Sequence, residues 1–484
     1  MSIIRIYNYK SSTIASNPDY QSLNSGKNAV FQLFYGGGGG DSSPDKRNNF
    51  SRFLLGFDLS NTLDRVNQNE INPELIKSVT LNLVNAFPTQ KDLENDYEYD
   101  VLYKRIARSY ELIAFDLPQV EWSEGLGQDL FRELYIQSNQ TNGYSPATGY
   151  CNWNYSRQLQ PWPSPGVYQN ITADTLFYNT QFFDNGNENI KIDIKDSFKN
   201  ALSSVTFNYG LGVAYSSPFE AISSDTRFLS SFFSENTNTS NKPYIEIEVD
   251  DYIKDDRLNI CTNKLNKLYL YTFAGNDAVN FYSAGTVSIV NSSNQPVLTG
   301  KTITKHSKGV YFIELTPDDL RGINATPGQR YKDVWQGITF DPTPGYDVQN
   351  VEQNFQIQKN PYLNNKPSIN NYKLTTYGID NGSIVSNEEM IRIFCDLRVN
   401  YSTNSPYTPY EIEYRMIMNN QTLCIDWTKI NQVCLDGKCM ENYFNLDTSW
   451  LLHNQTYKIQ FRVKELGTAK IMSEDIVFRV QRSF

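Results

Sequence analysis

Short runs in which apolar and polar residues alternate recur along the whole chain. Clear examples are residues 29–35, 53–59, 78–84, 191–194 and 244–249. A period of two places successive side chains on opposite faces of a strand, so one face of each run is predicted to be buried and the other to be wet. Gly, Pro and Asn residues separate these runs. The pattern therefore predicts many short strands joined by turns, which is typical of an all-β chain built from β-sandwiches.

Helical periodicity is scarce. The two best candidates are residues 126–135 and 195–202, and Asp193 or Asp196 is suited to cap the second of them. We therefore expect helices to be minor elements that connect strands.

A change in composition marks the end of the first unit. The last strand of this unit is followed by an acidic stretch that begins at Asp250, and acidic polar stretches of this kind separate domains. Residues 1–250 are therefore predicted to form a β-sandwich, and residues 251–264 are predicted to be a linker.

The remainder of the chain divides into two smaller units. Residues 265–360 have the length of an immunoglobulin-like sandwich and contain a central Trp335. A stretch rich in Pro and Asn at 359–367 is suited to a linker. Residues 361–484 are predicted to form a second immunoglobulin-like β-sandwich.

The balance of charges argues against two classes of partner. There are 43 Lys+Arg residues against 53 Asp+Glu residues, which gives a net charge of -10. A general nucleic-acid-binding protein needs a basic face, and an anionic membrane attracts basic segments. We therefore expect no nucleic acid and no membrane among the partners. The chain also lacks an apolar signal sequence and any run of about 18 apolar residues, so we expect a soluble protein made in a cytoplasm.

Residues suited to catalysis or metal binding are rare. The two histidines, His306 and His453, lack a motif partner, so both are predicted to be surface or strand-end residues. The six cysteines form no CxxC pair, although a hairpin would bring Cys424 and Cys434 within reach of a local bridge. We therefore predict that the chain is not an enzyme and holds no cofactor and no metal.

Two further runs have the composition of a site but not its spacing. The run from Gly36 to Gly40 lacks the Lys-Ser/Thr that follows the glycines of a phosphate-binding loop. The carboxylates between Asp92 and Asp100 lack the Gly and the terminal Glu of a calcium loop. Both runs are predicted to be surface loops.

An aromatic cluster in a turn-rich segment is the candidate contact surface. Its members are Trp122, Tyr150, Trp153, Tyr155, Trp162 and Tyr168. Aromatic rings with Asn and Gln nearby can stack on sugars and hydrogen-bond to them, which would make the cluster a glycan contact. Aromatic loops also close the ends of sandwiches or anchor subunit interfaces, which would give the cluster a packing or interface role.

The first unit resembles the DNRLRE family in the order of its motifs. Residues 24–28 read NSGKN, residues 52–59 read RFLLGFDL, residues 76–83 read IKSVTLNL and residues 121–125 read EWSEG. This family consists of jelly-roll-like sandwiches found in secreted bacterial proteins and some virion proteins. The resemblance implies a jelly-roll-like β-sandwich for the first unit, and a fold alone does not fix a function.

The whole chain is similar in style to virion structural proteins of crAss-like and related tailed bacteriophages. Those proteins are rich in Asn and Tyr, lack signal peptides and join β-sandwich or immunoglobulin-like domains around a neck or tail. The resemblance implies a non-enzymatic virion component, a neck or tail ring protein made in the host bacterial cytoplasm. Its partners would be other copies of itself in a cyclic ring and other tail, neck or portal proteins.

Two alternatives remain open at the level of the sequence. The first is a carbohydrate-binding or adhesin-like module on a virion or a cell surface, with a glycan as its partner. The second is a polysaccharide depolymerase, which would need a pair of carboxylates that converge in space.

Overall fold

A computed structural model describes most of the chain. The described residues are 2–16, 21–22, 24–36, 49–86, 109–125, 150–157, 160–203, 209–220, 227–257, 260–275, 277–283, 285–340, 350–358, 372–387, 390–399, 411–435, 439–465 and 468–482. Strands dominate and the few helices are short, so the predicted all-β sandwich class is confirmed. Of the helices in these ranges, none combines the length and the apolar character needed to span a membrane.

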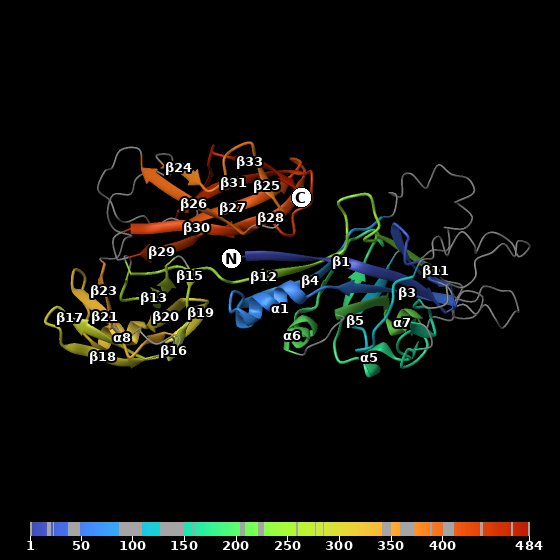
Figure 1. Cartoon of the computed structure of the whole chain (residues 1–484), viewed down its shortest axis with the longest axis horizontal. Helices are drawn as coiled ribbons and strands as arrows, with labels where there is room; N and C mark the ends of the chain where they lie inside the picture. Colours follow the sequence, from blue (N-terminus) through green and yellow to red (C-terminus); the bar gives the residue numbers. More distant parts are fainter. Residues whose placement is uncertain are drawn as a thin grey trace, which may run out of the picture. The chain divides into compact units, whose positions relative to one another are not determined.

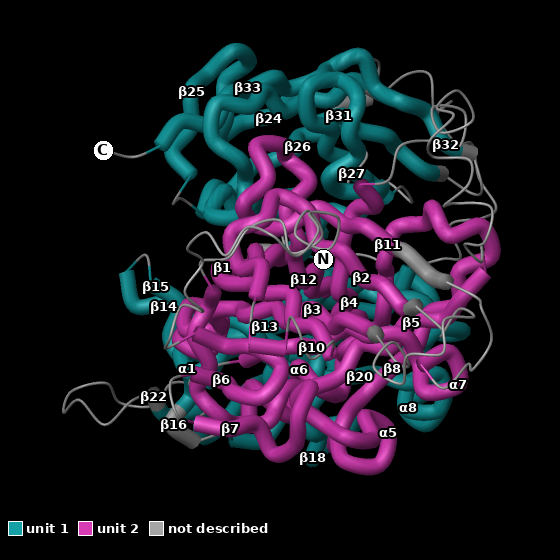
Figure 2. The backbone as a smooth tube through the Cα atoms, turned by 90° about the vertical axis from the view of Figure 1, so that its right-hand side faces the viewer, with its two compact units in different colours: residues 1–3, 65–76, 249–484 teal, residues 4–64, 77–248 magenta. Residues whose placement is uncertain are grey.

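The chain divides into two compact units, which Figure 2 shows in different colours. Unit 2 consists of residues 4–64 and 77–248. Unit 1 consists of residues 1–3, 65–76 and 249–484. The chain therefore crosses between the units four times, and unit 1 is assembled from three separate segments.

Unit 2 is built on one ten-stranded sheet (Figure 1). The path through the sheet is β8-β5-β10-β3-β1-β12-β4-β9, and β2 pairs with both β3 and β11. In chain order the strands are β1 (Ser2–Ala15), β2 (Val30–Gly36), β3 (Asn49–Phe57), β4 (Ile76–Leu83), β5 (Tyr110–Asp116), β8 (Tyr178–Phe183), β9 (Ile190–Asp193), β10 (Tyr209–Tyr215), β11 (Arg227–Phe233) and β12 (Tyr244–Val249).

The two ends of this path, β8 and β9, are joined by side chains. The Nδ2 of Asn179 donates a hydrogen bond to the carbonyl of Asp193 at 3.2 Å. The Nε2 of Gln181 donates to the carbonyl of Asn189 at 2.9 Å, and its Oε1 accepts the N–H of Lys191 at 2.7 Å. The sheet therefore curls until its first and last strands meet, and amide side chains replace the missing backbone ladder. This arrangement also covers the edge that β8 would otherwise leave open.

Short elements connect the strands of unit 2. They are α1 (Ser60–Asn67), β6 (Tyr155–Arg157), β7 (Gln160–Pro161), α5 (Ile171–Asp174), α6 (Lys195–Ser203) and α7 (Ser217–Glu220). The helix predicted at 195–202 is confirmed as α6, and Asp193 Oδ1 accepts the N–H of Lys195 at 2.9 Å where the helix begins. The predicted helix at 126–135, the carboxylate run at 92–100 and residues 37–40 of the glycine run lie outside the described residues.

Unit 1 contains two immunoglobulin-like sandwiches, and the first packs a three-stranded sheet against a four-stranded one. The strand orders are β13-β20-β19 and β18-β17-β21-β23. Trp335 is fully buried in the core between the sheets. The elements are η2 (Pro73–Leu75), β13 (Asn266–Tyr271), β14 (Phe273–Ala274), β15 (Asp277–Ala278), β16 (Phe281–Ser283), β17 (Thr286–Asn291), β18 (Pro296–Lys301), β19 (Thr304–Ser307), β20 (Val310–Leu315), α8 (Pro317–Gly322), β21 (Arg330–Gln336), β22 (Thr339–Phe340) and β23 (Val351–Gln356).

The second sandwich of unit 1 also has two sheets. One has the order β24-β26-β30-β29, and the other has the order β25-β33-β31-β27-β28 with β32 paired to β31. The rings of Tyr414 and Phe444 stack at 3.9 Å between the two sheets. The strands are β24 (Tyr372–Tyr377), β25 (Ser383–Ser386), β26 (Met390–Val399), β27 (Glu411–Met418), β28 (Thr422–Lys429), β29 (Asn431–Leu435), β30 (Cys439–Asp447), β31 (Thr456–Glu465), β32 (Thr468–Ile471) and β33 (Ile476–Gln481).

The suggested bridge between Cys424 and Cys434 does not form. No disulfide joins the two cysteines, and they lie on β28 and β29, which belong to different sheets. The Sγ of Cys434 instead contacts the carbonyl of Asp255 at 3.7 Å. Strands β28 and β29 follow one another in sequence but do not pair with each other, so they do not form the hairpin that a local bridge requires.

The segment predicted to be a linker, residues 251–264, is largely a buried part of unit 1. Lys254 forms a parallel bridge with Gln432 of the second sandwich, and Ile260 forms one with Ile357 of the first. The side chain of Ile253 packs in a small apolar cluster whose other buried members come from both sandwiches: Tyr269, Phe312 and Val433. The two sandwiches of unit 1 are thus joined by a connector that both of them bury.

A buried ion network fixes this connector. Asp255, Arg257 and Asp333 are fully buried. The guanidinium of Arg257 pairs with both carboxylate oxygens of Asp333 and donates to the carbonyl of Tyr269 at 2.9 Å. The indole of Trp335 donates to Asp333 Oδ2 at 2.7 Å. Burial raises the pKa of Asp255 to about 7. The single cation therefore compensates mainly Asp333, and Asp255 takes up a proton readily.

Residues 65–76 connect the two sandwiches of unit 1 in a second place. Arg65 forms an ion pair with Asp447 of β30 at 2.8 Å. The carbonyl of Asn69 accepts the N–H of Lys308 at 2.8 Å, and its Oδ1 accepts the ammonium of Lys305 at 2.8 Å. This short segment of the early chain therefore contacts strand β30 of one sandwich and the β19-β20 hairpin of the other.

His306 was predicted at the surface or at a strand end; it is buried near the end of β19, so the surface position is wrong. It sits on β19 with its ring edge-on to Tyr269, at 6.0 Å between ring centres. Its Nε2 has no hydrogen-bond partner among the described residues. Burial lowers the pKa of His306 to about 4. His453 is exposed, as predicted.

Acidification is expected to destabilise unit 1 through His306. The pKa of the imidazole is about 4 when folded and 6.5 in its ordinary state, so the unfolded chain takes up the proton first. Stability is therefore lost as the pH falls from 6.5 towards 4. When the pH is lowered from 7 to 4.5, the free energy of unfolding of the wild type should fall by about 2–3 kcal/mol more than that of His306→Gln. Urea titrations of both proteins at the two pH values measure this difference, and equal losses would contradict it.

Candidate functional site

Four of the six aromatic residues predicted to form a contact surface are buried in unit 2. Trp122, Trp153, Trp162 and Tyr168 belong to one core cluster. This cluster also contains side chains of the sheet, among them Ile113, Phe115 and Ala214. Rings that already pack against the sheet have no open face for a sugar or a neighbouring subunit. The role of these four side chains in the structure is packing at the sandwich, which was one of the interpretations left open.

Trp153 shows how this cluster is held together. Its ring meets Phe50 edge-on at 5.2 Å, and the guanidinium carbon of Arg52 lies 5.4 Å from the ring centre. Arg52 also donates to the carbonyls of Gly166 at 2.6 Å and Tyr168 at 2.9 Å. Gly166 has a φ of 75° and lies against the indole, where a side chain would collide with it. The turn-rich segment is therefore tied to the strand that carries Arg52.

The other two members of the predicted set differ in exposure. Tyr150 is half-buried, and Tyr155 on the β6-β7 ribbon is 43% exposed. Tyr155 is the member of the set whose ring is most open to solvent. Tyr155 is not a member of the core cluster that buries the other four, so the structure does not bring the six residues together as one surface.

Two of the motifs that carried the family resemblance, residues 24–28 and 121–125, meet in a polar junction. Lys27 forms an ion pair with Glu124, and Glu124 Oε1 accepts the N–H of Ser11 at 3.0 Å. Asn24 Nδ2 donates to the carbonyl of Cys151 at 2.9 Å. Burial and the neighbouring Glu124 raise the pKa of Glu235, which accepts the hydroxyl of Ser11. The contacts are internal, so these motif residues hold the segments of unit 2 together.

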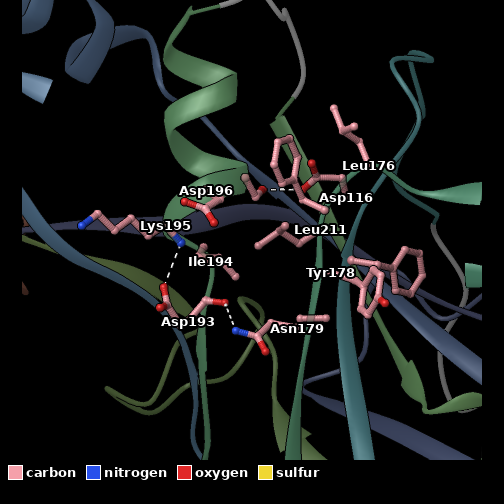
Figure 3. Close-up of a pocket in the computed structure, with 13 residues that line it drawn as sticks. Asp116, Leu176, Tyr178, Asn179, Asp193, Ile194, Lys195, Asp196 and Leu211 are labelled. Carbon is pink, nitrogen blue, oxygen red and sulfur yellow. Dashed lines mark hydrogen bonds between the residues drawn. The ribbon is translucent and has the colours of Figure 1, made fainter. Parts of the chain in front are cut away.

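A pocket of about 210 Å³ lies elsewhere in unit 2, where β5, β8, β9 and the start of α6 come together (Figure 3). One side is apolar and is formed by Leu176, Phe177 and Tyr178, which lie at the start of β8. The other side is polar and acidic. Its lining residues are Asp116, Asn179, Asp193, Lys195, Asp196 and Ser197.

Asp116 is the most perturbed group in the pocket. It ends β5, and its Oδ1 accepts the hydroxyl of Ser197, which is also 2.5 Å from the hydroxyl of Tyr209. Among the described residues, its second oxygen has no hydrogen-bond partner. Burial raises the pKa of Asp116 to about 6, and the Ser197 hydrogen bond opposes this rise. Tyr209 is fully buried, and burial together with Asp116 raises its pKa further above the ordinary value.

The other charged groups of the pocket are arranged asymmetrically. Asp193 and Asp196 are exposed at the start of α6, and one oxygen of Asp193 is engaged by the helix backbone. The ammonium of Lys195 donates to the carbonyl of Lys77 at 3.0 Å, and Figure 3 shows its side chain extended away from Asp116. The pocket therefore presents more negative than positive charge.

Exposed apolar side chains extend the apolar side of the pocket from Leu176 and Tyr178 to Phe182 on β8. Leu176 is 75% exposed, Tyr178 49% and Phe182 55%. Tyr178 and Phe182 lie an even number of residues apart on the strand, so they share its outer face. We call these three residues the β8 rim.

The chemistry available here is that of a binding surface. Within the described ranges, no three His, Cys, Asp or Glu side chains converge closely enough to hold a metal ion. A partly buried carboxylate beside exposed aromatic and aliphatic side chains can bind a cation that also has an apolar part. Two features of the sequence point to this site: Asp116 ends an apolar run, and Asp193 precedes a helix. Neither indicates that β5, β8 and α6 meet, because their pairing is non-local.

Comparisons with known proteins give a limited result. The chain matches none of the known protein-family models and none of the curated proteins with which it was compared. Among solved structures it is similar to Dpr2 Ig1-Ig2 in complex with DIP-Theta Ig1-Ig3, with 9% identity, coverage of 46% of this chain and 93% of that chain, and a TM-score of 0.15. It is also similar to fibronectin(III)-like modules of Clostridium thermocellum CbhA (9% identity, 48% and 91% coverage, TM-score 0.13). Chicken CNTN1 FN1-FN3 domains are a third such structure (11% identity, 46% and 65% coverage, TM-score 0.15). At these TM-scores the similarities carry no information on function.

Proposed function

We propose that the chain is a non-enzymatic structural subunit of a bacteriophage virion, a neck or tail ring protein that assembles with copies of itself. The observation that carries the assembly part is the β8 rim. Three large apolar side chains are exposed there, two on β8 and Leu176 just before it, and Leu176 and Tyr178 also line the pocket. Exposed apolar groups of this kind mark interaction sites, and aromatic residues are frequent anchors of interfaces. The virion setting is supported by the resemblance in composition and domain order.

Assembly is tested by the native mass of the full chain. We expect light scattering to give several times 55.6 kDa, with closed rings in negative-stain images of the same fraction. Tyr178→Ser should lower the native mass, whereas the control Tyr155→Ser, on another exposed tyrosine, should leave it unchanged. A strict monomer at every concentration would overturn the proposal.

A second candidate, a carbohydrate-binding module, is favoured by one face of the last sandwich. Tyr377 of β24 and Phe394 of β26 are directly paired, and they are 52% and 37% exposed. Arg392 of β26 lies 4.4 Å from the ring centre of Tyr443 on the neighbouring strand β30, and it donates to Asn445 Oδ1 of that strand at 3.0 Å. A row of rings with a fixed polar group beside it is suited to stack on a sugar and to hydrogen-bond its hydroxyl groups.

The two candidates are separated by one comparison. If the chain binds sugars through this face, Tyr377→Ala with Phe394→Ala should abolish retention on a glycan array and leave the native mass unchanged. If the chain only assembles, the wild type should show no retention at all.

A further inference from the structure

We propose that the pocket beside the β8 rim receives an arginine side chain of a partner protein, and that the rim covers the apolar stem of that side chain. This inference rests on the proposed function, because the partner at such a surface in a ring is a neighbouring subunit. It adds that the neighbouring subunit must place an arginine side chain at this surface.

The apolar side of the pocket is suited to the stem and the plane of an arginine. Leu176 and Tyr178 line the pocket and are also exposed at its edge. A guanidinium stacks on an aromatic face and keeps its charge when it is partly buried. The stem carries methylene groups, which pack against exposed leucine and tyrosine side chains.

The polar side of the pocket supplies the opposite charge. The Asp116 oxygen that has no hydrogen-bond partner among the described residues and the carboxylate of Asp196 border the same hollow as Tyr178 (Figure 3). The nearest cation, Lys195, is bonded to the carbonyl of Lys77. A carboxylate that is partly removed from water gains more from a bidentate guanidinium than one that is fully hydrated.

This arrangement makes binding dependent on pH. The pKa of Asp116 is raised to about 6, so the carboxyl is ionised at pH 7.5 and mostly protonated at pH 5. A protonated carboxyl does not attract a guanidinium, so binding should weaken in acid. The groups that face Asp116 from the surrounding elements are Ser197 of α6, Tyr209 of β10, Tyr168, Tyr178 of β8, and the charged side chains Asp193, Lys195 and Asp196.

The test measures binding of N-acetyl-L-arginine amide to the full chain by saturation-transfer difference NMR. The control ligand is N-acetyl-L-citrulline amide, which has nearly the same shape and no charge. At pH 7.5 we expect a signal for arginine at least five times that for citrulline, and a loss of most of this signal at pH 5.

Three variants locate the binding. Asp116→Asn with Asp196→Asn should remove the preference for arginine, because Asn at 116 still accepts the Ser197 hydroxyl but carries no charge. Tyr178→Ser should weaken the arginine signal. Asp318→Asn, on an exposed aspartate of unit 1, should change nothing.

Two results would overturn the inference: equal signals for arginine and citrulline, or an unchanged arginine signal in the double variant. The proposed function is judged separately. If the chain forms rings but shows no preference for arginine, only the inference is refuted. If the chain is a monomer that binds arginine through Asp116, only the proposed ring assembly is refuted.

Discussion

Replacing Trp153 by alanine is expected to lower the free energy of unfolding of unit 2 by about 3–5 kcal/mol. The indole is buried against Phe50 and Gly166, and Arg52 lies across it. Truncation leaves a cavity and removes the surface on which the guanidinium of Arg52 rests. Urea unfolding followed by tryptophan fluorescence and circular dichroism measures the loss.

Tyr155→Ala is the matched control, because Tyr155 was predicted as part of the same contact set but is 43% exposed. Its loss should stay below about 1 kcal/mol. If Trp153→Ala fails to fold, Trp153→Phe keeps a ring in the cluster and should lose less than half as much. A Trp153→Ala protein as stable as the Tyr155→Ala protein would show that the ring is a contact residue and not part of the core.

Replacing Arg257 by methionine is expected to lower the stability of unit 1 by about 3–5 kcal/mol. Methionine fills a similar volume but leaves Asp333 buried without its cation. The second buried carboxyl, Asp255, has a pKa raised to about 7, so it is partly protonated at neutral pH and Asp333 carries most of the uncompensated charge. The midpoint of urea unfolding, at pH 7, gives the loss.

The control for this prediction is an ion pair at the surface. Arg321 and Asp318 pair on α8 with most of each side chain exposed, so Arg321→Met should cost less than about 1 kcal/mol. Adding Asp333→Asn to Arg257→Met should recover part of the loss, because it removes the uncompensated charge and keeps an acceptor for the Trp335 indole. If the double variant were less stable than the single one, the loss would have to come from packing.

The sequence identified the elements whose signal is local. The strand at residues 78–84, the helix α6 and its carboxylate at Asp193 follow from periodicity and capping, which involve neighbours in sequence. The all-β class follows from the same periodicity. The assignment of residues 251–264 as a linker rested on their charges, but those charges are neutralised inside unit 1. Asp255 and Arg257 look solvated in sequence, because their partner Asp333 lies far along the chain.

The burial of four of the six predicted contact residues was not visible in the sequence, for a related reason. A run of Trp and Tyr residues shows that aromatic side chains are present but not whether they face the core or the solvent. Here Trp153 packs against Phe50 and Arg52 in the core. The β8 rim has a weaker signal in sequence, with three apolar residues among polar ones. Its position beside Asp116 depends on how β5, β8 and α6 meet in space, which no local pattern reveals.

The division of unit 1 into separate segments sets the order in which the chain can fold as it is synthesised. Residues 65–76 leave the ribosome early, but their partners Lys305, Lys308 and Asp447 come much later. At roughly 5–20 residues per second, the early segment waits on the order of ten seconds or longer for the first of them. During that time unit 2 can fold alone. Residues 65–76 remain without the partners they have in the finished chain, and a nascent chain stalled before residue 300 should expose them to a protease.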